Sequence, residues 1–143
     1  MSMPLSQLIE LTKQMHILYV EDNEDARTFT LEMLKRFFNN ITVAENGQDG
    51  LEKFKTNTFD FVLTDINMPK MNGLDMITEI RKLDACIPAI VLSAHNEANY
   101  HTEASRCGVN HYLAKPLSVN DLIQTLDMML TDRSLSTNKA SLV

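Results

Sequence analysis

Short strand-like runs alternate with helix-like segments along this chain. The strand candidates span residues 15–21, 41–44, 60–64, 89–93 and 111–114. Each is a brief, mostly apolar run rich in β-branched or aromatic residues, as expected of strands buried on both faces. This alternation is the pattern of βα units around a parallel sheet, so the sequence predicts an α/β fold.

Between these runs, apolar residues recur at helical spacing. After the first run, a stripe is expected to face the core, with Asn23 as a cap and acidic residues in the first turn. Its members are Ala26, Phe29, Thr30, Met33, Leu34 and Phe37. Further stripes follow at 47–54, 74–80 and 119–130. The segment 97–106 has few apolar positions, and we expect it to be the most weakly held helix.

The ends of the chain differ from its middle. Residues 1–14 form an N-terminal extension, in which Leu5, Leu8, Ile9 and Thr12 have the spacing of a short amphipathic helix. Residues 15–131 make up the predicted domain. The last stretch, 132–143, is rich in Ser, Thr and Asn, and its composition predicts a disordered tail.

Composition and charge narrow the class of protein. A chain of 143 residues suits one domain, and its net charge of −6 disfavours non-specific binding to nucleic acid or an anionic membrane. With no long apolar run and no secretory leader in view, we expect a cytoplasmic protein whose output goes to another protein. Cys86 and Cys107 show no metal-site spacing and are expected to be free thiols.

Charged residues stand where the predicted strands end. Glu21 and Asp22 close the first run, Asp65 closes the third, and Lys115 follows the last. Carboxyl ends of parallel strands share one edge of a sheet, so these side chains can meet in one crevice. Two carboxylates about 4 Å apart repel by roughly 4 kcal/mol at an effective dielectric of about 20, so a cation is expected among them.

Hard oxygen ligands favour Mg²⁺, or alternatively Mn²⁺. Asp22 and Asp65 fit as direct ligands, with the backbone carbonyl of Asn67 as a third. An oxygen of Asp65 would then attack a phosphoryl group in line, while the metal ion and Lys115 hold its other oxygens. Ser93 and Lys115 would supply donors to the phosphorylated product.

The chain resembles the receiver domain of two-component response regulators over roughly residues 15–130. Four blocks carry the resemblance, in the order and spacing of the family: Tyr19-Val20-Glu21-Asp22-Asn23, Leu63-Thr64-Asp65-Ile66-Asn67-Met68-Pro69-Lys70-Met71-Asn72-Gly73, Leu92-Ser93-Ala94 and Ala114-Lys115-Pro116. The resemblance implies a three-layer, doubly wound (βα)5 sandwich of the flavodoxin-like type, with a five-stranded parallel sheet in the order 2-1-3-4-5.

The resemblance also implies a role for each matching residue. Asp65 is the phosphoacceptor, served by a sensor histidine kinase or phosphotransfer protein, and Glu21 joins Asp22 and Asp65 around Mg²⁺. Ser93 is the hydroxyl switch, Tyr112 the aromatic switch, and Lys115 the cation that pairs with phosphate, followed by a cis bond to Pro116. Asn67 and His95 correspond to positions that tune phosphoryl loss.

The implied output is a signalling switch that catalyses only its own phosphoryl uptake and loss. It would alter a face formed by 97–106, 111–114 and the helix from Val119, for an unknown downstream protein. A phosphorylation-dependent homodimer is left open. Two departures from the family pattern, Glu21 for Asp and Ser93 for Thr, keep the chemistry but change the metal contact and the stiffness of the switch.

Purely structural roles and other functions are the alternatives to this interpretation. The alternative for His95 is an ordinary loop residue, and the alternative for Tyr112 is a half-buried core tyrosine. A pseudo-receiver that only docks partners would lack an acid or the lysine. A flavin carrier would need a hydroxyl-rich loop where Glu24 and Asp25 stand. A haloacid dehalogenase-like phosphatase would need an Asp in place of Asn67.

Overall fold

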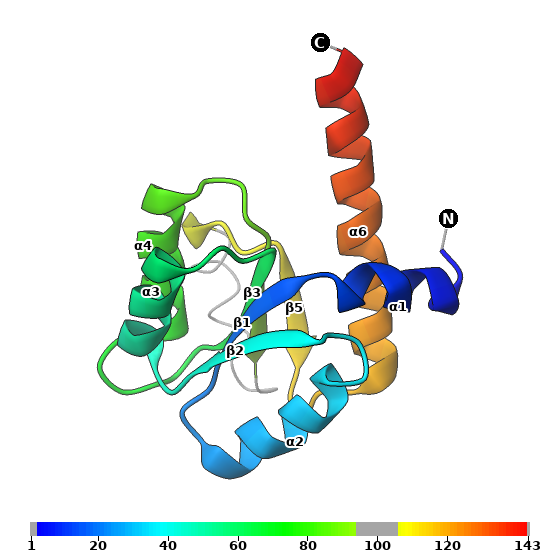
Figure 1. Cartoon of the computed structure of the whole chain (residues 1–143). Helices are drawn as coiled ribbons and strands as arrows, with labels where there is room; N and C mark the ends of the chain where they lie inside the picture. The colour runs from blue at the N-terminus through cyan, green and yellow to red at the C-terminus, as the bar shows by residue number, and fades with distance from the viewer. Residues whose placement is uncertain (1–2, 94–105, 143) are drawn as a thin grey trace.

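A twisted parallel sheet forms the centre of the molecule (Figure 1). The computed structural model describes residues 3–93 and 106–142, with side chains as far as Thr131. The strands are β1 (His16–Val20), β2 (Asn40–Ala44), β3 (Phe61–Asp65), β4 (Ala89–Ser93) and β5 (His111–Ala114). Their order is β2-β1-β3-β4-β5, and every neighbouring pair is parallel. The predicted α/β class and strand order are confirmed.

Helices cover both faces of the sheet. Their bounds are α1 (Leu5–Lys13), α2 (Glu24–Leu34), α3 (Gly47–Thr56), α4 (Gly73–Leu83) and α6 (Val119–Leu142). Figure 1 shows α3 and α4 on one side, and α2 and α6 on the other. The sequence predicted a further helix at 97–106, and nearly all of that segment lies outside the described residues.

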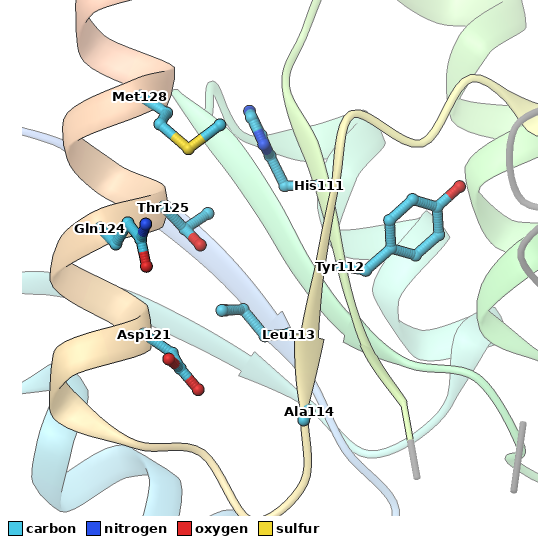
Figure 2. A pocket seen from close by; sticks show the side chains of 8 residues that line it. All are labelled: His111, Tyr112, Leu113, Ala114, Asp121, Gln124, Thr125 and Met128. Atoms are coloured by element: carbon cyan, nitrogen blue, oxygen red, sulfur yellow. The ribbon is translucent and has the colours of Figure 1, made fainter. Parts of the chain in front are cut away.

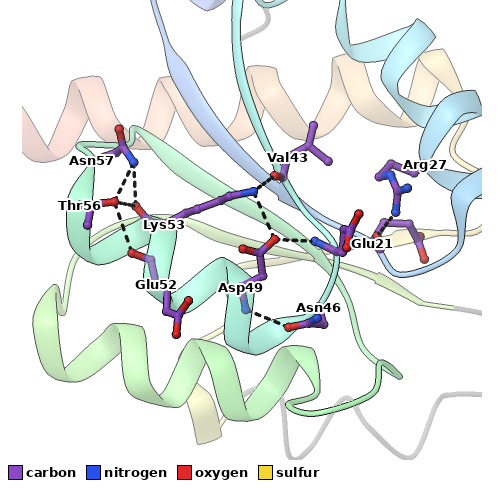
Figure 3. Close-up of polar contacts among 10 residues, drawn as sticks. Glu21, Arg27, Val43, Asn46, Asp49, Glu52, Lys53, Thr56 and Asn57 are labelled. Atoms are coloured by element: carbon purple, nitrogen blue, oxygen red, sulfur yellow. Dashed lines mark hydrogen bonds and ion pairs between the residues drawn. The ribbon is translucent and has the colours of Figure 1, made fainter.

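Helices α2, α3 and α4 each begin after an asparagine whose side chain caps the helix. The side-chain oxygens of Asn23, Asn46 and Asn72 each accept a hydrogen bond of 2.8 Å from a backbone N–H in the following turn. Each cap is followed by an acidic residue, which favours the positive end of the helix dipole. Figure 3 shows this turn of α3, together with Lys53, which donates to the carbonyl of Val43 at 2.6 Å. Short polar residues thus fix where each βα unit turns.

Alternation along the strands gives the sheet two separate cores. Ile17, Tyr19 and Leu63 face α2 and α6, together with Leu122 and other buried residues. The residues between them, such as Leu18 and Val62, pack instead against α3 and α4. Side chains alternate between the two faces with a period of two. The residues at the carboxyl ends of β1 and β3 therefore also point to one face or the other.

Helix α1 is packed into the first of these cores. Leu8 is 1% exposed, and the buried hydroxyl of Thr12 donates to the carbonyl of Phe37 at 2.8 Å, just beyond α2. The backbone N–H of Met3 donates to Asp127 of α6 at 3.1 Å. The extension predicted before the first strand therefore links the segment that follows α2 to the first half of α6.

The C-terminal helix is longer than the sequence composition indicated. A disordered tail was predicted from residue 132, whereas α6 continues to Leu142 and projects from the body of the domain (Figure 1). No glycine or proline interrupts residues 119–142. Once a helix is nucleated by packing, each added residue contributes a further hydrogen bond, so a polar composition alone does not stop it.

Truncation of Leu8 tests whether α1 is part of the folded unit. We expect Leu8→Ala to lower the free energy of unfolding by about 2–5 kcal/mol, because it empties a buried site between α1, α2 and α6. Leu5→Ala is the matched control on the same helix, since Leu5 is 50% exposed, and it should change stability by about 0.5 kcal/mol or less. Urea denaturation measures both, and equal effects would show that α1 is not packed as described.

Candidate functional site

Three carboxylates gather at the carboxyl edge of the sheet. Glu21 and Asp22 follow β1, and Asp65 is the last residue of β3. Strands β1 and β3 are neighbours, with Val20 opposite Thr64, so the next residue of each strand stands side by side. One oxygen from each of the three acids lies within 4.8 Å of the other two. The register of β1 and β3 therefore brings together the acids that the sequence placed in one crevice.

Lys115 joins these acids from the far side of β4. Its Nζ atom lies 2.9 Å from Oδ1 of Asp65 and 3.2 Å from Oε1 of Glu21. The backbone N–H of Lys115 donates to the carbonyl of Ser93 at 3.0 Å, which holds the start of this loop against the end of β4. The Lys115–Pro116 peptide bond is cis, as the resemblance implied.

The cluster is mostly shielded from water. Glu21 is 1% exposed and Asp65 6%, while Asp22 is exposed at the rim. Burial, with the nearby charge of Asp65, raises the pKa of Glu21 to about 7, although Lys115 works in the opposite direction. Burial alone would lower the pKa of Lys115, but Asp65 and Glu21 outweigh it and raise that pKa. The acids are therefore short of positive charge even with the lysine in place.

Several groups fix the positions of the acids. The backbone N–H of Ile66 donates to Oδ1 of Asp65 at 2.8 Å, and the N–H of Asn23 donates to Oε2 of Glu21 at 3.3 Å. Arg27 in α2 donates to the carbonyl of Glu21 at 2.9 Å (Figure 3). We did not predict this role for Arg27; its position one turn into a capped helix was the only available signal.

Gly73 makes a close approach that no side chain would permit. An added Cβ would lie 2.0 Å from the carbonyl oxygen of Asp65, and the Gly73 N–H donates to the carbonyl of Ile66 at 2.8 Å. The first turn of α4 is therefore pressed against the backbone of Asp65. Gly73 was part of the sequence motif. The requirement for glycine at this position comes from the contact with Asp65, which only the tertiary structure reveals.

The other predicted site residues lie around this edge in different ways. Ser93 ends β4 and is buried, whereas Asn67 is exposed two residues beyond Asp65. Tyr112 lies on β5, half-buried against the core beside α3 and α4, and Figure 2 shows it on the side of the strand away from α6. Strand alternation puts Ser93 on that same face of the sheet. His95 lies outside the described residues.

The donor set fits a hard divalent cation. Carboxylate oxygens from two strands converge, and the buried Oε1 of Glu21 has Nζ of Lys115 at 3.2 Å, an ammonium that it shares with Asp65. One ammonium cannot compensate three carboxylates, and a metal ion would supply the missing positive charge. The arrangement can therefore hold a metal ion beside an aspartate and a lysine.

The sequence matches the model of the response regulator receiver domain over residues 17–127. The chemotaxis protein CheY-3 of Vibrio cholerae is 36% identical over 120 residues, which cover 82% of this chain and 92% of CheY-3. The transcriptional regulatory protein ZraR of Klebsiella oxytoca is 33% identical over 124 residues, covering 87% of this chain but only 28% of ZraR. The chain belongs to the response regulator receiver domain family of two-component signalling.

Solved structures agree with this assignment. The N-terminal domain of an uncharacterized protein from Wolinella succinogenes superposes with a TM-score of 0.76 at 33% identity, covering 85% of this chain and 98% of that one. The receiver domain of a sensor histidine kinase from Pseudomonas aeruginosa, solved with a magnesium ion coordinated in its active site cleft, gives a TM-score of 0.71 at 28% identity. It covers 78% of this chain and 93% of that one.

The part of the chain that the structure describes contains no helix long and apolar enough to cross a membrane. Cys86 and Cys107 are free thiols, the first exposed and the second half-buried.

The raised pKa of Glu21 makes the metal-free protein sensitive to pH. A carboxyl group titrating near 7 in the folded state, against 4.5 ordinarily, binds more protons when folded, so its contribution to stability falls as pH rises from about 4.5 to about 7. Urea denaturation in chelator should show wild-type stability falling across this window relative to Glu21→Gln. Glu24→Gln, at an exposed position in the first turn of α2, should keep the wild-type slope, and parallel curves for Glu21→Gln and wild type would contradict the assignment.

Proposed function

We propose that Asp65 accepts a phosphoryl group in a two-component phosphorelay and that Glu21 and Asp22 hold Mg²⁺ beside it. The observation that carries the proposal is the position of the Asp65 carboxylate, 2.9 Å from Lys115 and within 4.8 Å of the other two acids. Oxygen donors and a magnesium-bound relative support Mg²⁺, with Mn²⁺ as an alternative. The backbone carbonyl of Asn67 is the proposed third ligand.

The chain's own residues supply most of the chemistry. An oxygen of Asp65 forms the new bond to phosphorus while the donor's bond to phosphorus breaks, and the electron pair of that bond leaves with the donor. Lys115 faces the charge that develops on the phosphoryl oxygens, and the N–H of Ile66 keeps Asp65 oriented. When bound, the metal ion neutralises the same oxygens and the neighbouring acids.

The product adds roughly −1.5 to −2 charge and three acceptor oxygens to an edge that is already acidic. The hydroxyl of Ser93 and the ammonium of Lys115 are the proposed donors to these oxygens. Ser93 and Tyr112 share one face of adjacent strands, where Ser93 pairs with Ala114. A movement at Ser93 is therefore the proposed route by which Tyr112 responds, with Asn67 and His95 tuning how long the phosphoryl group lasts.

The proposed partners follow from the family. A sensor histidine kinase or phosphotransfer protein in the cytoplasm would supply the phosphoryl group, and a downstream protein would read the result. The proposed output surface includes β5 and α6, where a cavity of about 370 Å³ lies between His111 and Met128 (Figure 2). On this view the domain is a signalling switch, which catalyses only its own phosphoryl uptake and loss.

Phosphoryl transfer to Asp65 can be tested by mass. Incubation with acetyl phosphate and Mg²⁺ should add one phosphoryl group to the wild-type chain. Asp65→Asn should abolish the gain, because the attacking oxygen is lost. The matched control is Asp75→Asn, which removes an exposed carboxylate from the first turn of α4 and should phosphorylate normally. Intact-mass spectrometry reads all three, and modification of Asp65→Asn at the wild-type rate would refute the assignment.

The switch can be tested without turnover. Beryllium fluoride with Mg²⁺ mimics the phosphoryl group, and we expect it to shift the amide NMR signals of Ser93, Tyr112 and residues of α6 near Met128. Lys115→Ala should weaken the response by about tenfold or more, because a direct partner of the phosphoryl oxygens is removed. Shifts confined to the acidic loops, with β5 unchanged, would rule out this route.

A further inference from the structure

A second cavity opens directly beside the acidic cluster. Its volume is about 410 Å³, and it lies between α2 and the loop that follows β5. Ala26 and Phe29 line it from α2, Pro116 and Leu117 from the loop, and Leu92 of β4 from the sheet. Phe29 is 50% exposed, although the sequence placed it on the buried stripe of its helix. The cavity is therefore a largely apolar space with an accessible aromatic side chain at its wall.

One end of this cavity is polar. Glu21 and Lys115 also line it, so the cavity and the acidic cluster share these two side chains. Oε1 of Glu21 is buried, and Nζ of Lys115 lies 3.2 Å from it. Asp25 adds a second carboxylate to the lining. A molecule lying here would have an anionic end at Lys115 and an apolar end against Phe29.

We propose that this cavity receives the apolar ring of a phosphodonor's leaving group, so that the domain favours ring-bearing acyl phosphates over small ones. The inference rests on the proposed function, because the phosphoryl end must lie at Asp65. The size fits: a cavity of roughly 150 Å³ is enough to hold a benzene ring, and this one is larger. Phe29 can pack against a ring, and aromatic pairs contribute about 0.5–1.5 kcal/mol beyond area burial.

The charges at the cavity narrow the class of donor. Lys115 attracts the phosphoryl end, whereas Asp25 and Glu21 disfavour a leaving group that carries a second negative charge. With a donor such as benzoyl phosphate, the oxygen of Asp65 bonds to phosphorus, the bond between phosphorus and the acyl oxygen breaks, and benzoate departs with the electron pair. No proton transfer or further reactant is needed.

The test compares two donors on the same protein. Phosphorylation rates with benzoyl phosphate and acetyl phosphate are measured with Mg²⁺, and their ratio is compared between wild type and Phe29→Ala. Using the ratio cancels the different intrinsic reactivities of the donors. We expect Phe29→Ala to lower the ratio by about fivefold, which corresponds to an aromatic contact of about 1 kcal/mol, with little change in the acetyl phosphate rate.

Leu83→Ala is the matched control, because Leu83 is a comparably exposed apolar residue at the end of α4, away from this cavity. It should leave the ratio unchanged. A binding measurement gives an independent readout: benzoylphosphonate, which cannot transfer its phosphonate, should shift the NMR signals of Ala26, Leu92 and Leu117 in wild type and less so in Phe29→Ala.

The outcomes separate the two proposals. If neither donor modifies the wild-type chain, the proposed function fails. If both donors modify Asp65 but Phe29→Ala and wild type give the same ratio, the proposed function stands and the ring-binding cavity is refuted. A ratio that falls equally in Leu83→Ala would also refute it, since the effect would then not belong to this cavity.

Discussion

Repulsion among carboxylates at one edge of the sheet is the constraint on which the rest of this structure depends. Glu21 and Asp65 are buried within reach of each other, and Lys115 lies between them at 3.2 and 2.9 Å. Buried like charges are unfavourable unless a cation compensates for them. A single lysine faces three carboxylates and leaves the cluster incompletely neutralised, and burial together with the charge of Asp65 raises the pKa of Glu21. The site is thus arranged to bind positive charge, and a bound cation would in turn stabilise the fold.

The architecture around the site holds the acids together against this repulsion. The β1–β3 register aligns the two strand ends, Arg27 anchors the carbonyl of Glu21, and Gly73 lets α4 approach the backbone of Asp65. These three contacts involve backbone groups, so none of them occupies a carboxylate oxygen. The acidic cluster lowers the stability of the fold locally, and the apolar cores on either side of the sheet compensate for this loss.

The helices at the two ends of the chain, α1 and α6, extend the receiver domain beyond the residues that match the family. Helix α1 precedes the family match, which starts at residue 17, yet Leu8 and Thr12 are fully packed. Helix α6 begins on the sheet and continues to Leu142. Since the backbone N–H of Met3, just before α1, donates to Asp127 of α6, the first part of α6 is tied to the N-terminal segment as well as to the sheet. The proposed output surface on β5 and α6 therefore includes a helix that the N-terminal segment holds in place.

The sequence by itself determined the class of fold, the strands to within a residue or so, and the acids and lysine that meet at the sheet edge. It could do so because short apolar runs, asparagine caps and strand-end charges are local signals, and because carboxyl ends of parallel strands necessarily share an edge. The motif with its cis Lys115–Pro116 bond came from the family resemblance.

Only the tertiary structure decided the rest. The anchoring role of Arg27, the contact that requires glycine at 73, the exposure of Phe29 beside a cavity and the continuation of α6 past residue 131 all depend on how elements pack. A helical stripe gives the direction of a side chain relative to its own helix but not what lies opposite, and composition gives no measure of how far packing extends a helix. Contacts between elements distant in sequence are set by the packed core, which no local pattern contains.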